Sequence, residues 1–244
     1  MAATRLGMIL PSSNTVVEPV AIAMAADCAD VSVHFSRFAL TAVNVADPAA
    51  AYYDSGALLG AARLLADARC HAICWNGSAG GLVGMARDRR LCDEIRAATG
   101  IAATTASLAL IDGFRRRGVR RFGMVTLNTP AMNATIARHF AAEGFDCVAS
   151  THRTDITDNF AMAAVSPREI AESVRECARA DLDAVIIYGT NTRGADVAAA
   201  LQEELGLPVF DSVAWGVFGA LEAAGADLDS LTRWAPHPVL AKAR

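Results

Sequence analysis

The chain has 244 residues, of which 53% are hydrophobic and 20% charged, and its formal net charge is −4. No stretch reaches the roughly 18 uncharged apolar residues that a membrane-spanning helix needs, so a membrane is not an expected partner. No basic cluster forms a stripe, so nucleic acid is not an expected partner either. The apolar segment at the N-terminus is too short for a secretory signal, which favours a cytoplasmic protein.

Short apolar runs alternate with longer amphipathic segments along the whole chain. The runs typical of strands are residues 6–10, 31–35, 72–74, 122–126, 147–150, 184–188 and 209–210. The segments typical of helices are residues 55–68, 107–114, 131–143, 167–179, 195–205 and 213–221. This alternation predicts an α/β fold in which helices cover both faces of parallel sheets.

Three blocks of the first half recur in the same order in the second half. Residues 5–10 match 121–126, residues 72–77 match 187–192, and residues 99–104 match 205–210. The second match places Gly189 opposite Cys74. The repeat predicts two pseudosymmetric lobes, each a parallel sheet flanked by helices, with the active site in the cleft between them. Chance similarity between two Gly- and Ala-rich halves is the alternative.

We expect the N-terminal lobe to comprise residues 1–115 and 214–244, and the C-terminal lobe residues 116–213. Ligands of parallel sheets bind beyond the carboxyl ends of the strands, so the strand-end loops of both lobes would face one cleft. These loops are residues 11–15, 74–78, 128–129 and 189–193. Their hydroxyl and amide side chains either stabilise a bound anion at helix N-termini or simply cap the helices.

Cys74 is the candidate nucleophile because it ends a buried strand before a helix, where a thiol pKa can be depressed. The other five cysteines are interpreted as core residues. Cys70 and Cys74 lie about 13 Å apart along a strand, too far to share a metal ion. Neither a metal site nor a disulfide is expected, and the glycine-rich motifs of nucleotide-binding loops are absent from the sequence.

Several segments together resemble the aspartate/glutamate racemase superfamily, in its maleate cis–trans isomerase and arylmalonate decarboxylase branch. They are the run Gly-Met-Ile-Leu-Pro-Ser-Ser-Asn-Thr-Val-Val-Glu at 7–18, the strand end at Cys74, and residues 118–126, 158–159 and 205–212. The resemblance extends from Gly7 to about Ala224. It implies a two-lobed fold and chemistry beside a carboxylate without a cofactor.

The resemblance also implies a set of site residues. Cys74 corresponds to a catalytic thiol, and Asn14 and Asn159 correspond to residues that hold the carboxylates of the substrate. With the strand-end loops, the expected substrate-binding residues are Pro11, Ser12, Asn14, Trp75, Asn76, Asn128, Asn159, Gly189, Thr190 and Asn191.

This sequence departs from the pattern at three positions. Gly189 stands at the second cysteine position, Asn128 stands where a tyrosine is usual, and the bulky Trp75 follows Cys74. Racemisation with two bases needs an acid and a base on opposite faces of the substrate carbon, so a single thiol argues against it.

Two reactions remain compatible with one thiol. The favoured hypothesis is cis–trans isomerisation of a maleate-type acid, with covalent addition of the Cys74 thiolate to the double bond. The alternative is decarboxylation of an arylmalonate-type acid, with Cys74 as the proton donor to the enediolate. Hydrolysis through an acyl-Cys74 intermediate lacks a paired histidine. A binding module for a small acid is the non-enzymatic alternative. In each case the partner is a small carboxylic acid, and a homo-oligomer is expected.

Overall fold

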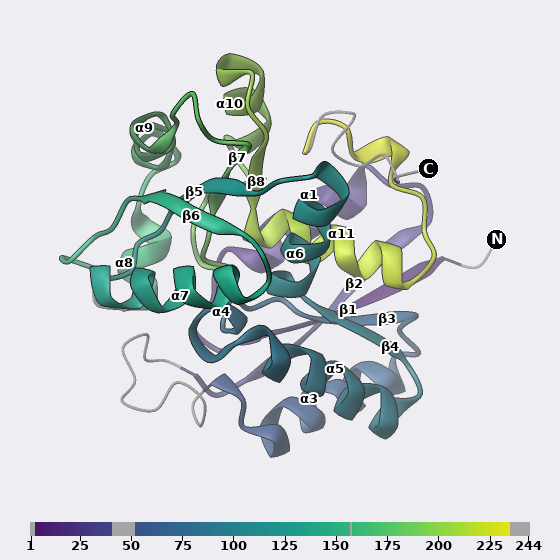
Figure 1. Ribbon diagram of the computed structural model, residues 1–244. Helices are drawn as coiled ribbons and strands as arrows, with labels where there is room; N and C mark the ends of the chain where they lie inside the picture. The colour runs from purple at the N-terminus through teal and green to yellow at the C-terminus, as the bar shows by residue number, and fades with distance from the viewer. Residues whose placement is uncertain (1–2, 41–51, 157, 235–244) are drawn as a thin grey trace.

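The computed structural model describes residues 3–40, 52–156 and 158–234. Two four-stranded parallel sheets dominate the molecule, with β1–β4 in the lower half of Figure 1 and β5–β8 in the upper half. The strands are β1 (Thr4–Pro11), β2 (Val31–Phe38), β3 (Ala72–Trp75), β4 (Ala102–Thr105), β5 (Arg121–Val125), β6 (Asp146–Ser150), β7 (Ala184–Ile187) and β8 (Val209–Asp211). The α/β fold with two helix-flanked parallel sheets is therefore confirmed.

Helices surround both sheets and also fill the space between them. They are α1 (Val17–Ala26), α3 (Ser55–Asp67), α4 (Gly80–Val83), α5 (Met85–Thr99), α6 (Ala106–Arg117), α7 (Pro130–Ala142), α8 (Asn159–Ala164), α9 (Pro167–Cys177), α10 (Ala198–Leu205) and α11 (Ser212–Ala223), with a short 3-10 turn, η1 (Asp229–Leu231). In the described part of the chain, none of them is long and apolar enough to cross a membrane.

Local sequence explains several helix ends. At α9 the Ser166 side chain accepts from the backbone N–H of Glu169, whose carboxylate accepts from Ser166 N–H in return, which is a capping box. Thr129 caps α7 in a similar way, just before Pro130. These signals lie within a few residues of the helix start, so the sequence predicts them well.

Strand pairing follows the same order in both lobes. The N-terminal sheet runs β2-β1-β3-β4 and the C-terminal sheet runs β6-β5-β7-β8. Met8 of β1 pairs with Cys74 of β3, and Met124 of β5 pairs with Ile186 of β7. Both methionines follow the glycine of the recurring Gly-Met pair, so the two sheets can be compared position by position.

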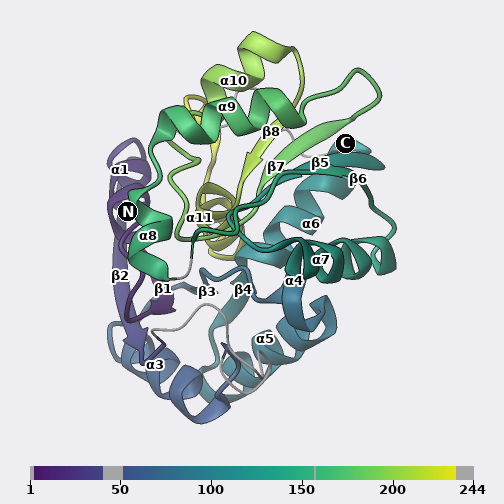
Figure 2. The same ribbon diagram turned by 90° about the vertical axis from the view of Figure 1, so that its left-hand side faces the viewer.

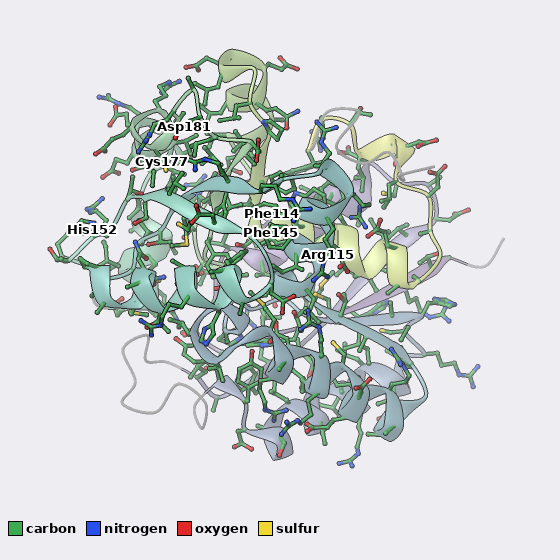
Figure 3. All side chains as sticks on the ribbon, viewed as in Figure 1. Phe114, Arg115, Phe145, His152, Cys177 and Asp181 are labelled. Carbon is green, nitrogen blue, oxygen red and sulfur yellow. The ribbon has the colours of Figure 1, made fainter. Side chains whose placement is uncertain are left out.

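Helix α11 lies between the two sheets and contacts α6, α1, β3 and β4 (Figure 1). Ten consecutive residues of α11, Ser212–Leu221, are buried. On the other side of α6, Phe114 packs edge-on against Phe145 at a centroid distance of 5.2 Å, and the two rings lie close together in Figure 3. Phe114 makes similar contacts with Phe122 of β5 and Phe210 of β8, so α6 joins the two lobes through aromatic packing.

The structure contains elements that the periodicity does not predict. Strand β4 has the sequence Ala-Ala-Thr-Thr, which lacks the apolar run of the other strands. Helix α1 is apolar on nearly every side and so shows no clear amphipathic stripe, whereas α5 is mostly polar with a narrow buried stripe that includes Met85, Leu91 and Ile95. The lobe boundaries at 115/116 and 213/214 stay a prediction.

Candidate functional site

A cavity of about 70 Å³ lies where strands of both sheets end. It has room for about five water molecules, at roughly 10–15 Å³ for each. Its lining comes mainly from strand-end loops and from α4, α7 and α8: Pro11, Asn14, Leu40, Tyr52, Trp75, Gly77, Ser78, Ala79, Leu82, Leu127, Asn128, Met132, Ile136, Asn159, Met162, Tyr188, Gly189, Thr190, Asn191 and Thr192. This is where a parallel-sheet protein is expected to bind a ligand.

Most of the expected substrate-binding residues line this cavity. They are Pro11, Asn14, Trp75, Asn128, Asn159, Gly189, Thr190 and Asn191. Ser12 is not part of the lining, because its hydroxyl exchanges hydrogen bonds with the backbone of Leu40. Asn76 is not part of it either, because its side chain points into the core and donates to the Val213 carbonyl.

Cys74 does not reach the cavity, and the expectation of a thiolate in the cleft is wrong. Its side chain is completely buried in the apolar cluster that contains Met8 and Trp215. Burial raises the pKa of the Cys74 thiol well above its usual value, and the nearby Cys92 and Asp88 raise that pKa further. The group is therefore a neutral thiol in a closed apolar environment.

The sheet register explains why the sequence match between Cys74 and Gly189 is misleading. Cys74 and Ile186 pair with the two equivalent methionines, so Ile186 is the counterpart of Cys74. Two residues further along, Asn76 N–H donates to the carbonyl of Ile9, as Tyr188 N–H does to that of Val125. Continuing by one residue makes Gly77 the counterpart of Gly189.

Glycine therefore stands at the equivalent strand-end position of both lobes. Gly77 and Gly189 both line the cavity. A Cβ atom at Gly77 would lie 2.4 Å from Cζ2 of Trp75, so the indole occupies the space that a side chain there would need. Gly189 has φ +155°, and a Cβ atom there would lie 3.0 Å from Oγ1 of Thr192. No cysteine lines the cavity within the described residues.

The asparagine side chains tie the two lobes together at the cavity. Asn14 accepts at Oδ1 from the backbone N–H groups of Val16 and Val17 and donates through Nδ2 to the Thr190 carbonyl at 2.8 Å. Asn191 accepts from Thr15 N–H at 3.0 Å and donates to the Asn159 carbonyl at 2.6 Å. Figure 2 shows α8, which begins at Asn159, beside the end of β1. Asn14 thus hydrogen-bonds to the backbone just before and at the start of α1, although Val16 is the N-cap residue.

Other polar groups of the lining remain available to a ligand. The hydroxyls of Ser78, Thr190 and Thr192 and the amide of Asn128 make no side-chain hydrogen bond to any residue that the structure describes. These neutral groups face an apolar wall that includes Leu82 and other aliphatic residues of the lining. Within the described ranges the lining contains no charged side chain, so an acid would be held by hydrogen-bond donors rather than by an ion pair.

Tyr188 is a site residue that sequence reasoning missed. Its hydroxyl donates to the Ser78 carbonyl and accepts from Gly81 N–H, both at 2.8 Å, and Ser107 Oγ lies 2.8 Å away. Tyr188 thereby fixes the loop after β3 from the opposite lobe. The only sequence signal was its place at the end of a predicted strand.

Two buried carboxyl groups lie behind the site without lining it. Asp88 accepts hydrogen bonds from Tyr53 and Thr105, and burial raises its pKa to about 6. Asp211 caps α11, and burial raises its pKa to about 7. Thr105 and Asp211 occupy equivalent positions, because they pair with Trp75 and Ile187 respectively.

Comparison with known proteins places the chain in a family. The arylmalonate decarboxylase family model matches residues 6–233. The chain is 31% identical to an arylmalonate decarboxylase from Bordetella bronchiseptica over 147 residues, which cover 58% of this chain and 60% of that protein. It is 26% identical to a maleate isomerase from Alcaligenes faecalis over 237 residues, or 92% of each chain.

Solved structures share the same fold. The maleate isomerase from Pseudomonas putida S16, solved with maleate, has a TM-score of 0.86 and 22% identity, over 99% of this chain and 98% of that one. A mutant of the Nocardia farcinica maleate cis–trans isomerase with a covalently bound succinylcysteine intermediate has a TM-score of 0.83 and 19% identity, over 93% and 95%. With a family model that matches nearly its full length, the chain belongs to the arylmalonate decarboxylase family.

Proposed function

We propose that this protein is a decarboxylase of a small malonate-type acid that works without a thiol at the reacting carbon. The observation that carries the proposal is the pair Gly77 and Gly189, which leaves the cavity without a nucleophilic side chain at either strand end. The relatives named above are a decarboxylase and isomerases, so decarboxylation and cis–trans isomerisation are the two reactions to distinguish.

Covalent isomerisation fits this site poorly. Addition to a double bond needs an ionised nucleophile in contact with the substrate. Cys74 is buried outside the lining, and its raised pKa keeps it protonated at neutral pH. In the proposed mechanism, Cys74 therefore forms no covalent adduct of the kind described for the Nocardia enzyme.

Loss of CO₂ needs no nucleophile. One carboxylate of the acid would face the apolar wall, where it is poorly solvated, and the other would face the free donors of Ser78, Asn128 and Thr190. Cleavage of the carbon–carbon bond releases CO₂ and leaves its electron pair on the remaining carboxylate as an enediolate. Neutral donors that are already in place stabilise that developing charge.

The second step is protonation of the enediolate carbon. With no thiol in the lining, water supplies the proton and hydroxide is released, which balances the reaction. A water molecule has no fixed position on one face of the carbon, so we expect the product to form slowly and without strong stereochemical preference.

A binding module for a small acid is the second candidate function. The same two glycines favour it, because a site without a thiol can hold an acid and leave it unchanged. The two functions differ only in turnover, so one assay separates them.

Proton NMR of the protein with malonate, methylmalonate, phenylmalonate and maleate tests the proposal. We expect loss of CO₂ from a malonate-type acid, with deuterium entering the product in D₂O, and the same rate for Cys74→Ser. Binding without turnover of any of these acids would favour the binding module. Conversion of maleate to fumarate that Cys74→Ser abolishes would refute the thiol-free mechanism.

A further inference from the structure

We propose that Trp75 binds the acid directly, by donating a hydrogen bond from its indole Nε1–H to a carboxylate oxygen. The proposal concerns the same cavity as the proposed function and rests on it for the class of ligand. It makes Trp75 a specificity-determining residue and gives a role to the bulky side chain that distinguishes this strand end.

The first supporting observation is an unsatisfied donor. Trp75 is 0% exposed, and its Nε1 has no hydrogen-bond partner among the residues that the structure describes. A buried N–H without a partner loses its hydration without compensation and is rare in native structures. The indole of Trp234, in contrast, donates to Asp27 at 2.7 Å. An acceptor supplied by a ligand would satisfy the Trp75 donor.

The second observation is the position of the indole edge. The atoms closest to a Cβ built at Gly77 are Cζ2 and Cε2 of Trp75, at 2.4 and 2.5 Å. Cη2 follows at 2.8 Å, so the benzo edge of the ring lies beside Gly77, and Nε1 is bonded to one of these atoms, Cε2. Both residues line the cavity. Phe38 packs edge-on against the ring at a centroid distance of 5.1 Å and helps to hold it in this orientation.

The opposite lobe offers no such group. The counterpart of Trp75 is Ile187, an aliphatic residue that packs into the core of its own lobe. An acid in the cavity would therefore meet the indole N–H from the N-terminal lobe and the Thr190 and Asn128 donors from the C-terminal lobe. This arrangement selects a ligand with oxygen atoms at two ends, as in a short dicarboxylate.

Titration of the ¹⁵N-labelled protein with malonate, followed through the indole N–H resonances, tests the inference. The resonance that is missing in Trp75→Phe identifies the Trp75 indole. We expect it to shift downfield as malonate binds, while the Trp234 resonance stays in place. By calorimetry, Trp75→Phe should bind malonate roughly tenfold or more weakly, as expected for loss of a hydrogen bond to a charged group.

Trp234→Phe is the matched control, because it removes an indole outside the cavity and should bind malonate as the wild type does. An unchanged affinity in Trp75→Phe, or a Trp75 resonance that does not move although malonate binds, would overturn the inference. So would absence of binding for malonate, maleate and phenylmalonate alike. A shift of the Trp75 resonance without any turnover would contradict the decarboxylase proposal and leave this inference standing.

Discussion

The strand ends of β3 and β7 have equivalent strand pairing and different surroundings. Both carry a glycine two residues after the last paired position, and both face one cavity. At the end of β3 the Trp75 indole fills the space beside Gly77, whereas at the end of β7 the nearest side chain to Gly189 is Thr192. The pseudosymmetry thus makes Gly77 and Gly189 equivalent positions. The neighbouring side chain, Trp75 or Thr192, determines how much room a side chain would have at each.

A second pair of equivalent positions differs in charge. Thr105 and Asp211 each cap the helix that follows the last strand of their sheet. In the N-terminal lobe the capping residue Thr105 is neutral and donates a hydrogen bond to a separate buried acid, Asp88. In the C-terminal lobe the capping residue, Asp211, is itself the buried acid. Within the described ranges, Oδ2 of Asp211 has no hydrogen-bond partner. We therefore expect the two lobes to respond differently to pH and to substitution.

The largest expected effect is a loss of stability as the pH rises. The pKa values of Asp88 and Asp211 are raised to about 6 and about 7 from the usual 3.8, so the folded protein keeps protons that the unfolded chain releases. Their stabilising effect is complete below pH 4 and is lost as the pH rises through 6 and 7. Between pH 5 and pH 8 the free energy of unfolding should fall by on the order of 4 kcal/mol.

Urea unfolding at several pH values measures this effect. Asp211→Asn keeps a side chain that can cap α11 and should remove the larger part of the slope. Asp88→Asn should remove the part centred at lower pH. A free energy of unfolding that stays constant or rises from pH 5 to pH 8 would contradict the assignment of these two groups.

Gly77→Ala should destabilise the protein by roughly 1–3 kcal/mol, because a methyl group would displace the Trp75 ring. The displaced ring should also weaken binding of malonate. Thermal unfolding and calorimetry measure the two effects. Adding Trp75→Leu to Gly77→Ala should recover most of the stability, and a double variant that is no more stable than Gly77→Ala would show that the ring contact is not the cause.

Gly189→Ala should have a smaller effect, about 1–2 kcal/mol, because the strain arises from φ +155° and one contact with Thr192. Thermal unfolding beside Gly77→Ala tests the contrast between the lobes. A larger loss of stability in Gly189→Ala than in Gly77→Ala would contradict the expectation that the Trp75 ring makes Gly77 the more sensitive position.

The smallest effect is expected for Cys74→Ala. The variant should lose about 1 kcal/mol of stability from the buried sulfur and keep its catalytic rate within about twofold. In the native wild type, iodoacetamide should label Cys74 more slowly than the partly exposed Cys28 and Cys147. Rapid labelling of Cys74, or a rate lowered a hundredfold in the variant, would restore a catalytic role for the thiol.

Most of the fold could be predicted from the sequence. Apolar runs marked seven of the eight strands in the described part of the chain, because this signal lies within a few neighbouring residues. The exception, β4, has a short run of alanine and threonine that becomes a strand only through its pairing with β3. The loops that line the cavity were also predicted, since they follow directly from the order of strands and helices.

Only the tertiary structure decided which residue of the N-terminal lobe is equivalent to Gly189 at the strand end. Sequence similarity matched Cys74 to Gly189, whereas hydrogen bonding between strands matches Cys74 to Ile186 and Gly77 to Gly189. The difference of three residues matters because side chains alternate between the faces of a strand. Cys74 points toward the core beneath α11, Trp75 packs on the opposite face with its ring reaching the cavity lining, and Gly77 lies past the end of the strand, in the same lining.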